Sequence, residues 1–456
     1  MKKTYIMFLA AVLSCGYASA QEKALSLDEC ISLAKEKNNS ISAAHRQAEA
    51  AEFSCKSMRA NFLPSFSVSG GALWSSADGS MSIPGGMLPV LGMDGNPTGS
   101  SAYFPGMDLD YSIDWIYGGS VSVTQPLYMG GKIIAGYKMT RLGREIADLN
   151  VRLKEDEVIL GTATAYANVI RAEELHKVAE SYNDLLAELL RTVRKASESG
   201  LGDRNDVLKV QVKVNESELS LRKAENAVRL AKMNLCHYIG YPLRSEISVT
   251  DALPSSDIGA PDGLDDISGR PEYQMLEKKS EAAFHQVRVT RAEALPQAGL
   301  FAGYGYAHGL NINDEPFLHK AGFSAGVKVS IPIFHFGEHY YKIRAQKATY
   351  EQTLAEQNDA CDMMILEMNK AANEMDEAEY ETALASGSIE SAEENLRVSR
   401  SRYDAGAETL ANLLEAQAAW QQAYQTGVEA EVNEFLTWLS WLKASGRLSS
   451  SMQSGR

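Results

Sequence analysis

The sequence predicts an α+β membrane protein in which short β-strands are joined to very long α-helices and the whole plan is internally duplicated. Three observations support this fold class. Segments in which apolar and polar residues alternate have the length of membrane-spanning strands. Each pair of such segments is followed by a proline-free helical stretch, at 132–198 and again at 338–403. A glycine-containing motif occurs twice, with Gly200 aligned to Gly406.

The N-terminus is typical of a secretory signal. Lysines precede an apolar run, and Ala18-Ser19-Ala20 matches the small-residue site of signal peptidase, so we expect residues 1–20 to be removed by cleavage after Ala20. Lipidation at Cys15 is the alternative, which the residues before Cys15 disfavour. The mature chain is therefore predicted to be exported. A net charge of −15 without a basic patch argues against a nucleic-acid partner.

The first repeat is predicted at 21–242. Its first helix, over 25–60, begins with a capping box formed by Ser26 and Glu29. The segment at 76–109 is rich in Gly, Pro, Ser and Met, so we expect a long exposed loop there. The other expected elements are strands at 65–74 and 111–127, a long helix at 132–198 and a return helix at 203–238.

The second repeat is predicted at 270–444 with the same plan, after a Pro-, Gly- and Asp-rich linker at 243–269. An apolar stripe with a spacing of about 3.5 residues runs from Tyr350 to Tyr403 and predicts coiled-coil packing. The expected elements are a helix at 270–295, strands at 300–308 and 321–333, a long helix at 338–403, a return helix at 409–444 and a flexible tail at 445–456.

The predicted strands separate apolar from polar side chains. In the first strand Phe66, Val68 and Trp74 share one face, and serines occupy the other. This alternation favours lipid-facing strands, with a soluble β-sandwich as the alternative. Four strands cannot close a barrel, and open sheet edges are not tolerated in a bilayer. We therefore expect several copies to complete one barrel, and three or more copies are favoured because eight strands would leave no open lumen.

Each glycine of the duplicated motif lies between two predicted helices and marks the tip of a helical hairpin. A glycine just beyond a helix end provides the left-handed cap. Apolar pairs follow both glycines, and we expect them to pack the tips or to bind a partner protein. These pairs are Val207-Leu208 after Gly200 and Leu413-Leu414 after Gly406.

Several motifs, each weak alone, occur in a fixed order along the chain. They are Tyr403-x-x-Gly406-x-x-Thr409-x-x-x-Leu413-Leu414-Glu415-Ala416, Gly200-x5-Asp206-Val207-Leu208, Leu63-Pro64, Leu295-Pro296, Gln125-Pro126-Leu127 and Gly130-Gly131. In these motifs and their order the chain resembles the TolC-like outer-membrane efflux proteins over nearly its whole mature length. The resemblance implies a homotrimeric twelve-stranded outer-membrane β-barrel, four strands per chain, continuous with a long periplasmic α-helical barrel.

The resemblance implies a passive exit duct and not an enzyme. Such proteins lie in the outer-membrane lipid of a Gram-negative-type bacterium and extend into the periplasm. They are opened at the periplasmic tip by an adaptor (membrane fusion) protein and an RND-type or ABC-type inner-membrane pump, in tripartite efflux or type I secretion. The alternative interpretation of the same residues is a periplasmic coiled-coil scaffold protein without a pore.

The resemblance also implies a periplasmic gate at the hairpin tips. The family pattern has a basic residue at position 408 and an acid at position 412, so Glu408 would repel Asp206 instead of pairing with it. A base nearby, Arg204 or Lys209, could take over the missing partner's role. By position, the gate and constriction candidates are Asp206, Arg204, Tyr403, Glu408, Asn412 and Glu415.

No cofactor or metal site is predicted. His335, Glu338 and His339 fit an HxxEH zinc motif, but they straddle a strand-to-helix junction, which favours coincidence over a secreted metallohydrolase. The methionines of 76–109 are too widely spaced for a soft-metal site. The cysteines of the mature chain are expected to be buried thiols, with a Cys30–Cys236 disulfide as the alternative; they are Cys30, Cys55, Cys236 and Cys361.

Overall fold

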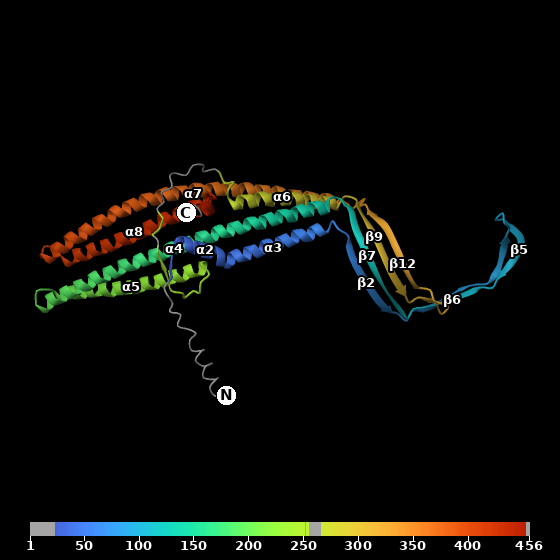
Figure 1. Ribbon diagram of the computed structural model, residues 1–456, viewed down its shortest axis with the longest axis horizontal. Helices are drawn as coiled ribbons and strands as arrows, with labels where there is room; N and C mark the ends of the chain where they lie inside the picture. Colours follow the sequence, from blue (N-terminus) through green and yellow to red (C-terminus); the bar gives the residue numbers. More distant parts are fainter. Residues whose placement is uncertain (1–22, 251, 255–265, 453–456) are drawn as a thin grey trace, which may run out of the picture. The chain divides into compact units, whose positions relative to one another are not determined.

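The computed structural model describes residues 23–250, 252–254 and 266–452 (Figure 1). The predicted signal peptide, its cleavage site and Cys15 lie outside these residues. The chain forms two compact units. The helical unit comprises Met1–Ala51, Gly143–Ser280 and Thr353–Arg456, and the sheet unit comprises Glu52–Leu142 and Glu281–Gln352.

The main sheet of the sheet unit is antiparallel and has the strand order β12-β9-β7-β2. Ser67 and Ser69 of β2 are paired with Ser122 and Ser120 of β7, and the hydroxyl oxygens in these pairs lie 2.7 Å and 3.0 Å apart. The neighbouring pairs, such as Val68 with Val121, lie on the opposite face. The predicted alternation is therefore confirmed. The strands are β2 (Ser65–Trp74), β7 (Trp115–Met129), β9 (Gln297–His308) and β12 (His319–Ser330).

The prediction of a loop at 76–109 was wrong, because three strands and the start of a fourth lie within it. They are β3 (Asp78–Ile83), β4 (Gly86–Leu91), β5 (Pro97–Phe104) and β6 (Met107–Ser112). The predicted strand at 111–127 is also divided, because Ile113 and Asp114 separate two strands. Strands β3 and β6 join the short strands β10 (Asn311–Ile312) and β11 (Glu315–Pro316) in one sheet, and β4 pairs with β5 in another. The glycines and prolines that suggested a loop lie both between the strands and within β3, β4 and β5, whereas serines and aspartates alternate with apolar residues within β3 and β6.

The predicted single helix at 25–60 was also wrong, because it is interrupted at Asn38. The first helix, α2 (Leu27–Lys37), has the expected capping box of Ser26 and Glu29. Asn38 is extended, with ψ of 128°. Its Oδ1 accepts a hydrogen bond from the N–H of Ser40 (2.8 Å), in the first turn of the next helix, α3 (Asn39–Ala60). An asparagine side chain competes with the helical hydrogen bonds in this way.

The long helices begin and end close to the predicted positions. Absence of proline and the capping residues explain this agreement. Within the described ranges, no helix is long and apolar enough to cross a membrane. The helices are α4 (Lys132–Glu198), α5 (Arg204–Tyr238), α6 (Pro271–Ala292), α7 (Glu338–Asp404), α8 (Leu410–Ala444) and α9 (Leu448–Ser451).

The main hydrophobic core of the helical unit is built chiefly by α4 and α8. Tyr166 of α4 and Leu439 of α8 are fully buried in it. Cys30 and Cys236 lie in the same core as free thiols, so the alternative of a disulfide between them is not realised. Cys55 lies on α3 and not on the helix of Cys30.

The predicted linker and tail contribute more to this core than expected. Strand β8 (Ile247–Val249) of the linker pairs in parallel with β1 (Lys23–Leu25), and the Ile247 side chain is buried. The tail was predicted to be flexible, but α9 folds back and buries Leu448 in the core. Both predictions followed from local composition, which does not report contacts with distant segments.

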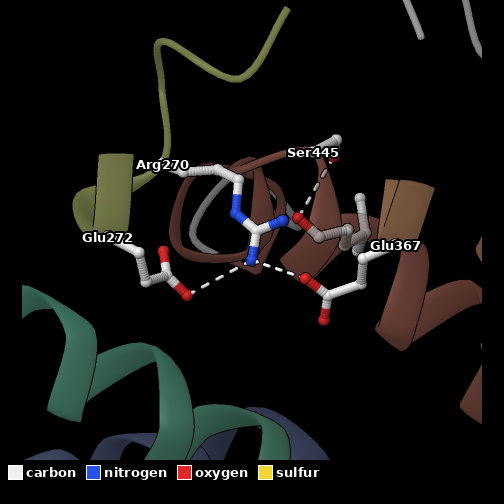
Figure 2. A network of polar contacts seen from close by, with 5 residues as sticks. Arg270, Glu272, Glu367 and Ser445 are labelled. Carbon is white, nitrogen blue, oxygen red and sulfur yellow. Dashed lines mark hydrogen bonds and ion pairs between the residues drawn. The ribbon is translucent and has the colours of Figure 1, made fainter. Parts of the chain in front are cut away.

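Arg270, at the end of the linker, forms an ion pair with α7, the long helix of the second repeat (Figure 2). Its side chain is almost fully buried, and Nη2 lies 2.8 Å from Glu367 Oε2 on α7 and 3.4 Å from Glu272 Oε1 on α6. A buried guanidinium requires such partners because desolvation of a charge is costly. The contact therefore positions the start of α6 against α7 within the helical unit.

Candidate functional site: the tips of the two helical hairpins

The first hairpin closes with a Schellman turn between α4 and α5. Gly200 has a φ of 75°, a left-handed conformation that glycine adopts without a steric penalty. The Leu201 N–H donates to the Ala196 carbonyl (2.9 Å), and the Gly200 N–H donates to the Ser197 carbonyl (3.1 Å). These two bonds satisfy carbonyl groups that the end of α4 would otherwise leave unpaired.

The second hairpin closes with the same turn between α7 and α8, at the same end of the helical unit (Figure 1). Gly406 has a φ of 71°. The Ala407 N–H donates to the Arg402 carbonyl (2.8 Å), and the Gly406 N–H donates to the Tyr403 carbonyl (3.0 Å). The duplicated motif therefore encodes the same helix-ending turn twice.

Each return helix begins with a side-chain cap. The Asp203 carboxylate accepts a hydrogen bond from the Asn205 N–H (3.0 Å) at the start of α5. Thr409 Oγ1 accepts one from the Asn412 N–H (3.4 Å) at the start of α8. Aspartate and threonine are favoured at this position because they satisfy free N–H groups of the first turn.

An apolar tip cluster packs the two hairpins against each other. Leu413 is only 2% exposed, so its role is packing within one chain and not direct contact with a partner. Val207, Tyr403 and Leu414 are partly buried at the edge of the cluster. The buried members are Tyr182, Leu186, Leu189, Leu190, Val193, Val210, Val214, Leu410 and Leu413.

The charged residues of the first tip pair within their own helix. Lys209 Nζ lies 3.1 Å from Asp206 Oδ1, and both side chains are substantially exposed. Arg204 is exposed to solvent. Of the two bases that the sequence offered as partners for Asp206, the structure therefore selects Lys209. An exposed pair of this kind contributes little to stability.

Tyr403 of the second tip lies within electrostatic range of Asp206 on the first tip. Burial in the tip cluster raises the pKa of the Tyr403 phenol, and the negative charges of Asp206 and Asp404 raise it further. The phenol is therefore neutral at physiological pH. The structure thus brings together two of the candidates, Tyr403 of the second tip and Asp206 of the first.

The remaining candidates lie apart from this contact. Glu408 is half-buried, and its Oε2 atom is enclosed without a hydrogen-bond partner among the described residues. Asn412 and Glu415 are exposed on α8. Within the described part of the chain, no ion pair joins Asp206 to Glu408, consistent with the like charges noted in the sequence.

Two features of the tips were not identified from the sequence. Arg400 Nη2 of α7 lies 2.9 Å from Glu188 Oε1 of α4 and links the two hairpins directly. No local pattern could have paired residues so far apart in the chain. Leu201 is 88% exposed at the first tip. Its position directly after Gly200 was a signal that the sequence did offer.

The HxxEH segment does not assemble into a metal-binding group. Glu338 forms an ion pair with Lys342 (2.7 Å), and the rings of His335 and His339 stack edge to face at 4.7 Å. The residues that the structure describes contain no group of three or more His, Cys, Asp or Glu side chains arranged to hold a metal ion.

The fold is that of outer-membrane channels. It aligns with the Campylobacter jejuni CmeC outer membrane channel with a TM-score of 0.76 and 17% sequence identity, over 94% of this chain and 88% of that chain. It aligns with the outer membrane protein VceC of Vibrio cholerae with a TM-score of 0.73 and 17% identity, over 92% and 96% of the two chains.

Sequence comparison agrees with the fold. The Pseudomonas aeruginosa alkaline protease secretion protein AprF is 22% identical over 339 residues, which are 73% of this chain and 69% of AprF. The pyoverdine export outer membrane protein OpmQ of the same species is 25% identical over 329 residues, 70% of this chain and 67% of OpmQ. The family described as "Outer membrane efflux protein" matches residues 30–241 and 267–439. The chain belongs to this family of outer-membrane transport proteins.

Proposed function

We propose that three copies of this chain form a passive outer-membrane exit duct of a tripartite efflux or type I secretion system. The observation that supports a trimer is that the four-stranded sheet is open at both edges. Strands β2 and β12 each have one neighbour within the described sheet. In lipid their free edges would leave backbone groups without hydrogen bonds, so copies must pair edge to edge. Three copies give a closed barrel of about twelve strands with an open lumen.

The exposed faces of α5 and α7 support the same assembly. Each carries large apolar side chains that the single chain leaves exposed. These are Val212, Leu219 and Leu230 on α5, and Met363, Leu366, Tyr380 and Leu384 on α7. Burial of two such faces between neighbouring copies would build a closed ring of helices.

The mass of the detergent-solubilised protein tests the oligomer. A trimer that partitions with the outer membrane agrees with the proposal. A monomer extracted without detergent would instead favour the periplasmic scaffold. Sequencing the N-terminus of the purified protein tests the proposed cleavage after Ala20 against lipidation at Cys15.

The tips are proposed as the periplasmic gate, formed by Asp206, Arg204, Tyr403, Glu408, Asn412 and Glu415. The contact of Tyr403 with the tip cluster and with the charge of Asp206 supports this role. The duct would open when an adaptor protein, coupled to an RND-type or ABC-type pump, separates the hairpins. Relatives named for protease secretion and for pyoverdine export support either system.

The adaptor is proposed to contact the exposed apolar residues at the tips. Leu208 is exposed, and Val207 and Leu414 are half-buried at the edge of the tip cluster. Gly200 and Gly406 shape the turns that present them. Leu413 contributes by packing and not by contact.

Single-channel conductance tests the gate. Removing tip charges with Asp206→Ala or Arg204→Ala should raise the conductance of the closed channel, because these side chains hold or constrict the mouth. Glu216→Ala is the control, since Glu216 forms an exposed pair with Lys213 further along α5 (2.8 Å). Conductance equal to that of the unmodified protein in both tip variants would show that the gate lies elsewhere.

A further inference from the structure

The connection between β2 and β7 forms an amphipathic ribbon. We use "ribbon" for the paired strands β3 and β6 with the distal hairpin of β4 and β5. The register pairs Met81 with Leu109 and Ile83 with Met107. Since paired residues and alternate residues share a face of a sheet, these four apolar side chains lie together.

Tyr111 extends the apolar face of the ribbon. It is paired with Gly79, and a Cβ atom at Gly79 would lie 2.7 Å from Tyr111 Oη, so the ring covers the glycine on this face. Ile312 of β10 is paired with Tyr111 and adds to the same face. Met81, Ile83, Met107 and Tyr111 are all exposed.

The opposite face of the ribbon is polar. The Ser82 hydroxyl donates a hydrogen bond to the Asp108 carboxylate across the strand pair. Ser80 is paired with Asp110 and Asp78 with Ser112. The segment 75–113 contains no lysine, arginine or histidine. Its polar face is therefore acidic, and its apolar face carries no charge that could pair with a charged partner.

The apolar face of the ribbon lies on the same side as the apolar face of the main sheet, which faces lipid in the proposed barrel. Hydrogen bonds from Ser75 N–H to the Asp114 carbonyl (3.0 Å) and from Ile113 N–H to the Ala77 carbonyl (2.9 Å) connect the two ladders. Odd-numbered positions are apolar on both sides of this junction, at Met107, Leu109, Tyr111, Ile113, Trp115 and Tyr117. The aspartate and serine positions 108, 110 and 112 likewise continue the serine face of β7. On the other strand the register shifts by one residue between the Trp74–Trp115 and Asp78–Ser112 pairs, so the even-numbered polar positions of β3 follow the odd-numbered serines of β2.

The distal hairpin has an unusual composition for an exposed segment. Strands β4 and β5 contain no charged residue. Met87 and Tyr103 are paired on one face, while Leu88 is exposed on the other. An apolar surface of this kind must be covered, since its exposure to water is unfavourable.

We infer that the ribbon binds a lipid surface, with its apolar face and the distal hairpin in contact with the acyl chains of the outer leaflet. The apolar face of the ribbon lies on the lipid-facing side of the main sheet, which favours lipid over a second copy of the chain as its partner. Copies that met across the lumen would meet through the acidic face instead. This inference rests on the proposed placement of the main sheet in the outer membrane.

Site-directed fluorescence on the full-length protein tests this inference. Single cysteines are introduced as Met81→Cys and Met107→Cys on the apolar face, with Ser80→Cys and Asp108→Cys as matched controls on the polar face. Each is labelled with a polarity-sensitive fluorophore, and the unmodified chain supplies the background, since Cys30, Cys55, Cys236 and Cys361 are buried or half-buried. The protein is reconstituted in vesicles of phosphatidylethanolamine and phosphatidylglycerol, with or without a nitroxide on the acyl chains.

The expected result is a shift to shorter wavelength and several-fold stronger nitroxide quenching at positions 81 and 107 than at 80 and 108. Equal quenching on both faces, or no quenching on either, overturns the inference. A shifted emission without quenching would show that protein covers the face, and would also overturn it. Val68→Cys on β2 separates this failure from a failure of membrane placement, since a probe there is quenched whenever the sheet lies in lipid.

Discussion

The two helical hairpins have equal lengths, but the long helix supplies the large buried side chains in the first and the return helix supplies them in the second. Helices α4 and α7 have 67 residues each, and α5 and α8 have 35 each. In the first hairpin the long helix supplies large buried side chains such as Tyr166 and Leu186, whereas in the second the return helix does so with Leu439 and Leu442. The duplicated backbone therefore carries two different burial patterns.

This difference gives each helix of a pair its own role. Helices α4 and α8 supply most of the cores within one chain. Helices α5 and α7 keep exposed apolar side chains, and a trimer would bury these between copies. A duplicated chain thus needs two distinct faces per hairpin, one for its own core and one for its neighbours.

The largest expected change in stability follows the replacement of a buried leucine, and an exposed leucine provides the comparison. Leu186 on α4 is 0% exposed and Leu219 on α5 is 58% exposed. Leu186→Ala should destabilise the protein by about 2–5 kcal/mol because it leaves a cavity. Leu219→Ala should change the stability of the single chain by no more than about 0.5 kcal/mol. Denaturant unfolding followed by circular dichroism measures both changes.

The Leu219→Ala variant also tests whether α5 contacts a neighbouring copy in the trimer. Leu219→Ala should promote trimer dissociation on dilution if α5 faces a neighbouring copy. If it affects neither stability nor dissociation, α5 is a solvent-facing helix, and the division of roles between the hairpins fails.

A smaller effect is expected at the turns that the hairpins share. Gly406→Ala places a side chain at a φ of 71° and should cost about 1–2 kcal/mol. Gly143→Ala within α4 is the control, since a Cβ there meets no atom within 4 Å. That change should stabilise the helix by about 0.5–1 kcal/mol. Thermal unfolding of both variants, together with Gly200→Ala, would reveal whether the two tips are equivalent.

The contact between the hairpins should contribute still less. Arg400 and Glu188 are both about half exposed, so their coupling should be about 0.2–1 kcal/mol in a double-mutant cycle. Arg397 and Glu394 serve as control because they pair within α7 (2.6 Å). Loss of the inter-hairpin pair should raise channel conductance, whereas loss of the control pair should not. Equal conductance in both sets would argue that the hairpins separate without breaking this contact.

The smallest effect depends on pH. Burial raises the pKa of Asp156 on α4, and the charges of Glu272 and Glu155 add to this, against opposing contributions from Ser449 and Lys35. A carboxyl whose pKa is raised by folding destabilises the fold as pH rises above its ordinary value of 3.8. Asp156→Asn should therefore gain stability relative to the unmodified protein at pH 7 but not below pH 3.8.

The control for this pH effect is Asp184→Asn, an exposed aspartate on the same helix. At pH 7 it should gain less stability than Asp156→Asn, because its side chain is exposed. A gain for Asp156→Asn that is independent of pH would mean that packing against Ser449, and not the charge, determines the effect.

Local patterns in the sequence predicted the regular elements well. Strand β2 and helix α4 have the predicted bounds, because alternation along a strand and the absence of proline along a helix are local properties. Two of the failures are also local in origin, whereas those at the linker and the tail are not. Asn38 ends a helix through its own side chain, and its Nδ2 donates to the distant Tyr238 carbonyl (3.0 Å). The alternation in 78–83 and 107–112 was masked by the glycines and prolines between and within the strands.

The candidate site was predicted less completely than the fold. Glycine positions identified both tips, since left-handed caps require glycine. The sequence could not decide whether Arg204 or Lys209 partners Asp206, because both lie within one helical turn of it. It also could not reveal the pairing of Arg400 with Glu188, which depends on how two hairpins lie side by side.

The sequence by itself determined the bounds of β2 and, within a few residues, of the long helices, that the plan is duplicated, and that each hairpin turns at a glycine. These features depend on backbone sterics, caps and periodicity over a few neighbouring residues. Only the tertiary structure decided that α4 and α8 form the core, that Leu413 is buried while Leu208 is exposed, and that the segment between β2 and β7 is a ribbon. Such features depend on contacts between residues far apart in the chain, which only the folded arrangement brings together.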